Sequence, residues 1–214
     1  MATLFDFHGY PTMFTGIITA TGKITALQAL EDGVRLTVSA PALALADVAI
    51  GDSIAHGGVC LTVIAKKKTS YEVDVSRESL NCTVGLDREG GEVNLEKAMR
   101  LSDFIGGHLV SGHVDGVGEV VKFEPIGESH ELVIKAPKEL AKYIARKGSV
   151  TVDGVSLTTN RTSGKGGRKF SINLIPHTVA VTTLRNLQAG SKVNLEVDLI
   201  ARYVERMLNG GAQA

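Results

Sequence analysis

Two five-residue stretches, Gly58-Val59-Cys60-Leu61-Thr62 and Gly154-Val155-Ser156-Leu157-Thr158, lie 96 positions apart and share four of their five residues. The same offset aligns other pairs, among them Gly22 with Gly118 and Ala40-Pro41 with Ala136-Pro137. Farther along, residues 93–96 (VNLE) recur unchanged as residues 193–196, because a longer glycine-rich loop at 163–167 raises the offset to 100. Self-similarity at a fixed period indicates repeated structural units. We therefore predict two homologous domains of about 90 residues, joined near residues 102–107.

Short runs in each copy alternate apolar and polar residues, which is the period of half-buried strands. In the first copy these runs are 34–38, 53–55, 59–65, 71–75 and 92–95. A closed barrel is the natural arrangement for about six such strands, because closure leaves no exposed sheet edge. The sequence therefore predicts an all-β fold of two tandem β-barrels.

Helices are expected at two kinds of position. Each copy is expected to contain one helix, which is clearest in the second copy, where Pro137 suits a first turn and Gly148 a stop. The C-terminal residues 199–208 repeat apolar side chains at 3.6-residue spacing, which predicts an amphipathic helix outside both barrels. This helix packs on its own domain or against another subunit, and one apolar stripe leaves both arrangements open.

The composition excludes several classes of protein. Lys and Arg number 23 and Asp and Glu also 23, so the net charge is zero and a nucleic-acid-binding role is not expected. No apolar run is long enough to span a membrane, and residues 1–12 lack the pattern of a secretory signal, so a cytoplasmic protein is expected. Cys60 and Cys82 are the two cysteines, and their spacing predicts neither a disulfide framework nor a zinc site.

The two copies differ in chemistry at aligned positions. Three pairs stand out: Ile17 with His113, Gly57 with Asp153, and Cys60 with Ser156. The second copy thus contains an imidazole, a carboxylate and a hydroxyl at these positions. This asymmetry would let one pocket hold a molecule that donates a chemical group and the other pocket hold a molecule that accepts it.

Plainer interpretations of the same residues remain open. Cys60 also fits an inert buried thiol, Asp153 a turn residue, and Asp198 a cap of the C-terminal helix. His108 and His113 are separated by five residues, which would place them on opposite faces of a strand, so no shared metal site is expected.

The chain after residue 12 resembles the α-chain type of riboflavin synthase. The resemblance is carried by Met13-Phe14-Thr15-Gly16-Ile17, by residues 59–63 (VCLTV), by residues 106–114 (GGHLVSGHV) and by residues 153–158 (DGVSLT). It implies tandem six-stranded Greek-key barrels at 13–106 and 107–198, with a trimerisation helix and tail at 199–214. Residues 1–12 would be an N-terminal extension.

The resemblance also implies an activity and its partners. Two molecules of 6,7-dimethyl-8-ribityllumazine would be dismutated by transfer of a four-carbon unit, giving riboflavin and 5-amino-6-ribitylaminopyrimidinedione in the last step of riboflavin biosynthesis. No metal or redox cofactor is implied. The active site would lie between the N-terminal barrel of one subunit and the C-terminal barrel of another in a homotrimer, and lumazine synthase is a possible partner.

Substrate-binding residues can be transferred from the family position by position. Those assigned to the first barrel are Gly16, Ile17, Ile18, Cys60, Leu61, Thr62, Asp74, Val75, Ser76, Arg77, Glu78 and Ser79. Those assigned to the second barrel are Gly112, His113, Val114, Lys147, Asp153, Ser156, Leu157, Thr158, Ile175, Pro176, His177, Thr178, Val179 and Ala180.

The residues expected to take part in the chemistry are His113, Ser156, Cys60, Phe14 and Asp198. The reaction needs a proton removed from the 7-methyl group of one lumazine and a nucleophile added to the other. We expect His113 and Ser156 to transfer protons and align the rings, Cys60 or water to assist addition, and Phe14 to pack on a ring.

The alternative function is a non-catalytic lumazine- or flavin-binding protein built on the same duplicated barrel. Such a binder needs one good pocket, whereas this chain keeps polar groups in both copies. A flavin reductase would need a further nicotinamide-binding domain, for which 214 residues leave no room. One departure from the family concerns Gly57, where relatives commonly have Asn, which removes any side-chain contact from that position.

Overall fold

The first copy folds as a closed six-stranded barrel in the computed structural model, which describes residues 12–210. Its strands are β1 (Ala20–Leu30), β2 (Gly33–Ser39), β3 (Ser53–His56), β4 (Val59–Lys66), β5 (Ser70–Ser76) and β6 (Glu92–Lys97). They follow one another around the barrel as β1-β2-β5-β4-β3-β6. The hairpin strands β3, β4 and β5 are neighbours and β6 returns beside β3, which is a Greek key. The five runs predicted as strands are all confirmed.

The second copy repeats this order with one strand broken in two. It consists of β7 (Gly116–Ile126), β8 (Ser129–Lys135), β9 (Ser149–Val152), β10 (Val155–Thr158), β11 (Arg161–Ser163), β12 (Lys169–Leu174) and β13 (Lys192–Val197). These form a seven-stranded sheet in the order β10-β9-β13-β7-β8-β12-β11. Strands β10 and β11 together take the place of β4, with residues 159–160 between them. The predicted six-stranded unit is thus closed in the first copy and split in the second.

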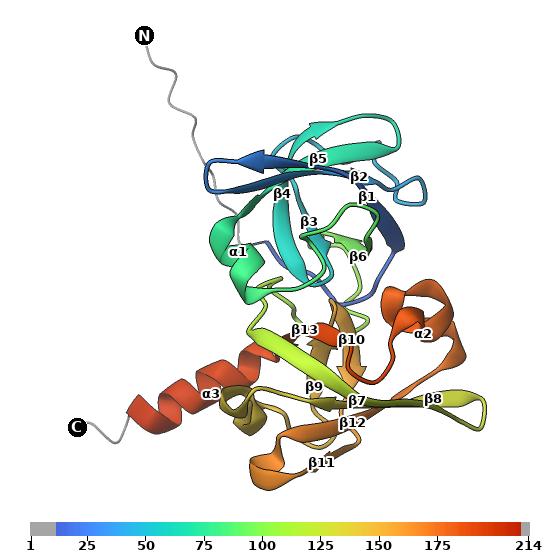
Figure 1. The fold of residues 1–214 in the computed structure, drawn as a ribbon. Coiled ribbons are helices and arrows are strands. Elements are labelled where there is room, and N and C mark those ends of the chain that lie inside the picture. The colour runs from blue at the N-terminus through green and yellow to red at the C-terminus, as the bar shows by residue number, and fades with distance from the viewer. Residues whose placement is uncertain (1–11, 211–214) are drawn as a thin grey trace.

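The two copies also share fine details of their sheets and cores. A register shift between Ile24 and Ala26 in β1 recurs between Val120 and Lys122 in β7, 96 positions later. Each copy encloses its own cluster of buried aliphatic side chains, and a small third cluster containing Phe14 and Val110 lies between them. Figure 1 shows the two bodies one above the other.

The predicted helix after Pro137 is a short 3-10 helix, η1 (Lys138–Tyr143), with Pro137 as its N-cap rather than in its first turn. The first copy contains the one helix expected there, whose position was not predicted, α1 (Arg77–Cys82), capped by Ser76. The second copy contains a helix that was not predicted, α2 (Pro176–Val181). Both helices are too short to show helical periodicity. Two further 3-10 helices, η2 (Lys165–Gly167) and η3 (Thr183–Asn186), complete the second copy.

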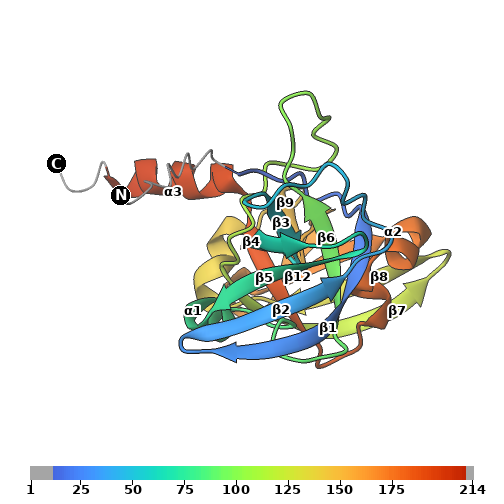
Figure 2. The same ribbon diagram turned by 90° about the horizontal axis from the view of Figure 1, so that it is seen from above.

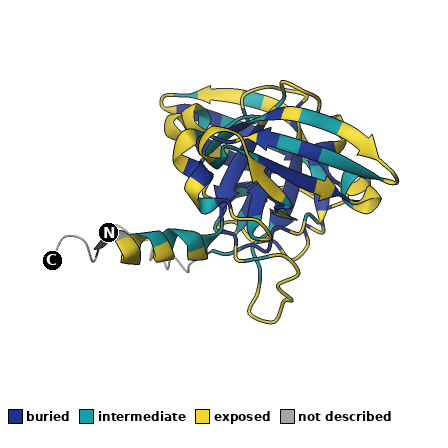
Figure 3. Ribbon diagram, turned by 90° about the horizontal axis from the view of Figure 1, so that it is seen from below, coloured by how far each residue is buried: buried dark blue, intermediate teal, exposed yellow. Residues whose placement is uncertain are grey.

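The C-terminal helix α3 (Leu199–Gly210) projects away from both copies (Figures 2 and 3). Arg202 pairs with Asp115 at 2.5 Å, and Glu205 accepts hydrogen bonds from Lys142 and Tyr143, so one side of the helix is anchored to the second copy. Its apolar side chains stay exposed: Ile200, Tyr203, Val204, Met207 and Leu208. Within residues 12–210 no helix is long and apolar enough to cross a membrane.

A buried polar pair distinguishes the two cores. The Tyr71 hydroxyl lies 2.7 Å from Nε2 of His56, and Nδ1 of His56 lies 2.9 Å from the Ile54 carbonyl oxygen. Both side chains are buried, and burial lowers the pKa of His56 to about 4. The aligned residues of the second copy are Val152 and Phe170, which need no hydrogen bond. The first core therefore contains a hydrogen-bonded unit that the second core replaces with apolar packing.

We predict that this pair adds an acid-sensitive contribution to the stability of the protein. Between pH 6.5 and 4 the unfolded chain protonates His56 and the folded chain does not, so stability falls as the pH falls through this window. The loss from this residue between pH 7 and pH 5 should be about 2 kcal/mol in the free energy of unfolding. Urea denaturation at both pH values measures it as the difference between the unaltered chain and the double variant described next, because contributions of other groups are common to both proteins.

The double variant His56→Val/Tyr71→Phe, which copies the second core, should lose this part of the pH dependence. Tyr71→Phe alone should destabilise the protein by about 1–3 kcal/mol, because it leaves Nε2 of His56 buried without its partner. Equal pH dependence in the double variant and the unaltered chain would contradict the assignment.

Candidate active site

The site is organised by two short segments that precede the barrels, residues 13–18 (the first leading segment) and residues 109–114 (the second leading segment). They pair with each other through Phe14 and Val110, whose backbones exchange hydrogen bonds of 2.7 and 3.0 Å. Each segment then bonds to the other copy: the Gly16 carbonyl accepts from Ser156 N and the Gly112 carbonyl from Cys60 N, both at 2.8 Å. The aligned residues Cys60 and Ser156 thus have matched backbone environments.

This crossing reverses one expected grouping. Ile18 packs against the core of the second copy, and Val114 packs against the core of the first. Gly16 and Ile18, assigned from sequence to the first barrel, therefore border the second, whereas Ile17 lines a cavity beside the first. Gly112 and Val114, assigned to the second barrel, border the first. The leading segment of each copy thus packs against the other copy.

On the first copy, the predicted residues follow the outer face of the paired strands β4 and β5 and the start of α1. Thr62, Asp74 and Ser76 are exposed, whereas Leu61 and Val75 point into the core and offer only their backbone to a ligand. Cys60 is half-buried, and burial raises the pKa of its thiol.

The β5 end of this face also carries an exposed ion pair. The guanidinium of Arg35 lies 2.8 and 3.0 Å from the two carboxylate oxygens of Asp74 and lowers the pKa of that carboxyl. Next to it, Arg77 and Glu78 at the start of α1 are exposed. This face thus exposes carboxylate and hydroxyl groups that can form hydrogen bonds with a ligand.

On the second copy, Ser156 is paired with a histidine that was not predicted to take part. Nδ1 of His108 lies 2.8 Å from the Ser156 hydroxyl oxygen, and Nε2 of His108 is buried without a hydrogen-bond partner among the described residues. Burial lowers the pKa of His108, and the charge of Asp198 opposes this shift. A neutral imidazole carries one proton and one lone pair, so the pair is suited to proton transfer.

The sequence contains a signal that distinguishes His108. The 96-residue offset aligns His108 with Thr12, so the first copy has no equivalent imidazole. The expectation that His108 and His113 lie on opposite faces of a strand was wrong, because the segment containing them forms only the single bridge at Val110. His108 faces the second copy, whereas His113 follows Gly112 at the first copy and is exposed.

Three other predicted residues have structural surroundings that bear on their roles. Phe14 is fully buried between Ala55 and Val110, so in this structure it shapes the junction and does not present its ring to a ligand. Asp198 accepts a hydrogen bond from Ile200 N at 2.9 Å, which confirms the helix-cap alternative. Lys147 is exposed, with a left-handed φ of 66°.

The remaining predicted residues of the second copy lie in the β9–β10 hairpin and in and before α2. Asp153 occupies the β9–β10 turn with φ of 48°, its Oδ1 accepts from Asn194 N at 2.8 Å, and burial raises its pKa to about 7. Leu157 and Val179 pack partly on the second core, whereas Thr158 and the residues 175–177 that lead into and begin α2 are exposed.

A cavity of about 930 Å³ adjoins the first copy and is lined by Ile17 and Thr62 among the predicted residues. Its other walls, which were not predicted, include Ser53, Lys97 and Arg100. One wall belongs to the loop of residues 40–52, for which no sequence motif was evident.

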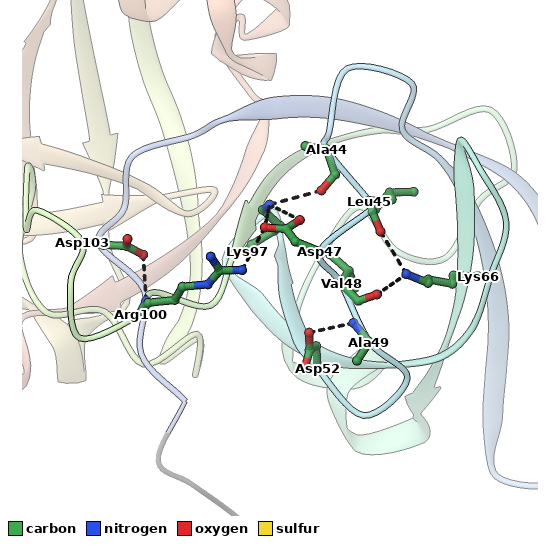
Figure 4. A network of polar contacts seen from close by, with 10 residues as sticks. All are labelled: Ala44, Leu45, Asp47, Val48, Ala49, Asp52, Lys66, Lys97, Arg100 and Asp103. Atoms are coloured by element: carbon green, nitrogen blue, oxygen red, sulfur yellow. Dashed lines mark hydrogen bonds and ion pairs between the residues drawn. The ribbon is translucent and has the colours of Figure 1, made fainter.

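Figure 4 shows the hydrogen bonds and ion pairs that hold the loop of residues 40–52 against the barrel. Lys97 Nζ lies 2.8 Å from Oδ1 of Asp47, and Arg100 Nη2 lies 2.9 Å from Oδ2 of the same carboxylate. Lys66 Nζ donates to the carbonyls of Leu45, at 3.1 Å, and Val48. The hydrogen bond from Lys97 lowers the pKa of Asp47. These charges thus hold the wall of the cavity in place.

Comparison with known proteins agrees with the duplicated architecture. The model of the lumazine binding domain matches residues 15–98 and 111–198. The riboflavin synthase of Photobacterium phosphoreum is 47% identical over 197 residues, which cover 92% of this chain and 89% of the relative. The riboflavin synthase of Mycobacterium tuberculosis is 44% identical over 198 residues, covering 92% and 98%. The chain belongs to the riboflavin synthase family.

A solved structure described as LumP complexed with riboflavin has the same architecture. It superposes with a TM-score of 0.77 at 26% identity, covering 86% of this chain and 98% of that one. The two family-model matches begin at Thr15 and Ser111, within the two leading segments. In this riboflavin synthase family member, each leading segment thus belongs to its own repeat in the sequence. In the folded structure the same segment packs against the other repeat.

The close approach at Ser156 yields a prediction about Gly107. A Cβ atom on Gly107 would lie 2.2 Å from the Thr15 carbonyl oxygen and 2.7 Å from Ser156 Oγ. Gly107→Ala should therefore displace the first leading segment and destabilise the protein by about 1–3 kcal/mol, measured by urea denaturation. Gly106→Ala is the matched control, because its nearest neighbour is Cγ1 of the Ile17 side chain at 3.3 Å. Equal stability of the two variants would contradict this view of the junction.

Proposed function

We propose that this chain is a riboflavin synthase that converts two molecules of 6,7-dimethyl-8-ribityllumazine into riboflavin and 5-amino-6-ribitylaminopyrimidinedione. The observation that carries the proposal is the pair of matched but chemically different surroundings at Cys60 and Ser156. A dismutation needs two similar pockets for two identical molecules, and it needs them to differ because one molecule donates four carbons and the other accepts them. Membership of the family supports the same reaction.

The second copy is assigned the proton-transfer step. Ser156 and His108 form the hydrogen-bonded pair at 2.8 Å, and burial favours the neutral imidazole, which can accept a proton from the 7-methyl group through the serine hydroxyl. Asp198 stabilises the imidazolium that results. His113 remains a candidate, but its position after Gly112 assigns it to the first copy.

We assign to the first copy the other step, in which a nucleophile adds to the second lumazine molecule. Cys60 lies beside Gly112, the residue before His113, so a thiol, an imidazole and water can meet one ring there. The raised thiol pKa favours a neutral Cys60 that orients the ring or donates a hydrogen bond, rather than a thiolate nucleophile. The exposed groups of Asp74 and Ser76 suit the hydroxyls of a ribityl chain.

The alternative function is a carrier that binds lumazine or a flavin without turnover. The solved LumP structure, described as a riboflavin complex, has the same fold, so the fold cannot separate the two functions. The Ser156–His108 pair favours the enzyme, because binding a ring does not require a buried imidazole bonded to a serine.

We infer a homotrimer joined through α3, with each active site formed by the first barrel of one subunit and the second barrel of another. The exposed apolar side chains of α3, such as Tyr203 and Met207, supply the contact. The protein is assigned to the cytoplasm, and lumazine synthase is proposed as a partner because its product would be the substrate.

Turnover tests the function directly. The purified chain mixed with 6,7-dimethyl-8-ribityllumazine, without added cofactor, should form one riboflavin for every two lumazines consumed, measured by absorbance. Tight binding of lumazine with no riboflavin formed would establish the carrier instead.

Substitutions separate the proposed roles. Ser156→Ala and His108→Gln should each lower kcat/KM at least tenfold, and the double variant should lose little more, because the two residues act as one unit. His113→Gln should also lower kcat/KM. His130→Gln is the control, because His130 stacks on Phe123 in the β7–β8 hairpin. Losses below about threefold for Ser156→Ala and both site-histidine variants would overturn these assignments.

Charges on the exposed face of α3 should break the trimer. We expect Tyr203→Lys/Met207→Lys to sediment as a single chain and to lose activity, whereas the unaltered protein sediments as three chains. Ile126→Lys is the control, because it places the same charge on an exposed apolar residue of the β7–β8 hairpin. A trimeric double variant would show that another surface holds the subunits together.

A further inference from the structure

Two buried glutamates, which the mechanism above does not use, hold the leading segments. Oε1 of Glu96 accepts hydrogen bonds from Thr15 N at 2.7 Å and Thr15 Oγ1 at 2.6 Å, and Oε2 accepts from Gly16 N at 2.9 Å. The residue is 5% exposed. Both carboxylate oxygens of Glu96 are thus engaged by donors of the first leading segment.

Glu196 repeats this arrangement in the second copy. Its Oε1 accepts from Ser111 N and Ser111 Oγ, both at 2.7 Å, and its Oε2 accepts from Gly112 N at 3.0 Å. Its exposed fraction is 2%. Both glutamates end the repeated VNLE motif, so the same strand position, at the end of β6 or β13, carries the same function twice.

The chemistry of these contacts requires a carboxylate. Among residues 12–210 no Lys, Arg or His forms an ion pair with either glutamate, so backbone N–H and hydroxyl groups alone compensate for burial. Burial raises the pKa of both carboxyls, and the hydrogen bonds oppose that shift. A glutamine at either position would turn one acceptor into a donor facing N–H groups.

Each glutamate is connected through a glycine to the opposite copy. Glu196 holds Gly112, whose carbonyl accepts from Cys60 N in the first copy, and the next residue is His113. Glu96 holds Gly16, whose carbonyl accepts from Ser156 N in the second copy, and the next residue is Ile17. Gly16 and Gly112 have φ values of 75° and 76°, which make the same sharp turn from the glutamate to the partner copy.

We propose that Glu96 and Glu196 are positioning residues that act crosswise: Glu196 sets the surroundings of Cys60 and the place of His113 in the first copy, and Glu96 sets the surroundings of Ser156 in the second. The catalytic meaning of these surroundings rests on the proposed function, but the crosswise coupling does not. A reporter that needs no turnover therefore tests it separately.

The first reporter is the thiol of Cys60. In a Cys82→Ser background, which removes the exposed second cysteine, Cys60 is alkylated with iodoacetamide over a range of pH. Glu196→Gln should raise the plateau rate at high pH about tenfold, because Gly112 no longer covers Cys60. Glu96→Gln should leave this rate within twofold.

The plateau is the decisive quantity because Glu196 also raises the pKa of Cys60 through its charge. Loss of that charge alone would move the midpoint of the pH profile and leave the plateau unchanged. Glu196→Asp keeps the charge and shortens the side chain by one methylene, so it should raise the plateau as well. A changed midpoint with an unchanged plateau would overturn the proposal.

The second reporter exchanges the roles of the two copies. A Cys60→Ser/Cys82→Ser/Ser156→Cys variant places the single thiol at the aligned position of the second copy. Here Glu96→Gln should raise the plateau rate about tenfold, and Glu196→Gln should leave it within twofold. Equal acceleration of both reporters by either glutamine would indicate general loosening of the fold and would overturn the crosswise coupling.

Milder variants keep the test decisive if the glutamine variants fail to fold. Thr15→Ala and Ser111→Ala each remove one hydroxyl from the carboxylate and leave the glutamate in place. Thr15→Ala should speed alkylation at position 156 alone, and Ser111→Ala at Cys60 alone, each by about threefold. No change at either reporter would contradict the proposal.

Discussion

The backbone hydrogen bonds from Ser156 to Gly16 and from Cys60 to Gly112, both 2.8 Å long, tie each copy to the leading segment of the other. Each segment thereby fills part of the surface of its partner copy, as Ile18 and Val114 do when they pack on the opposite cores. The copies are therefore not independent units joined by a linker. The junction joins the backbone at Cys60 and at Ser156 to the leading segment of the opposite copy.

Duplication followed by divergence explains why the pockets are alike in shape and different in chemistry. The backbone framework of glycine turns, glutamate contacts and crossed segments is repeated in both copies. Within that shared framework, the side chains at Cys60 and Ser156 can differ without disturbing the fold. His108, which bonds to Ser156, has no imidazole counterpart, since the offset aligns it with Thr12. A dismutation places this same demand on its enzyme, because identical substrates must be treated differently.

The cores have diverged in the same way. The first core keeps the hydrogen-bonded pair of His56 and Tyr71, and the second fills the aligned space with Val152 and Phe170. The burial of His56 and of Asp153 shifts their pKa values in opposite directions, to about 4 and about 7. Protonation in mildly acidic solution therefore weakens the folded state at His56 and strengthens it at Asp153, so their effects partly cancel.

The sequence by itself determined the duplication, five strands of the first copy and the family, because repeated motifs and alternating apolar residues are visible in the order of residues alone. It also named both members of the Cys60 and Ser156 pair, since an alignment of the copies exposes chemical differences. The short helices α1 and α2 lacked enough turns to show a period. Only the tertiary structure decided that Gly16 and Ile18 border the second barrel, that His108 rather than His113 contacts Ser156, and that Phe14 is buried. These facts depend on where the leading segments cross, and a crossing is set by contacts between residues far apart in sequence, which no local pattern records.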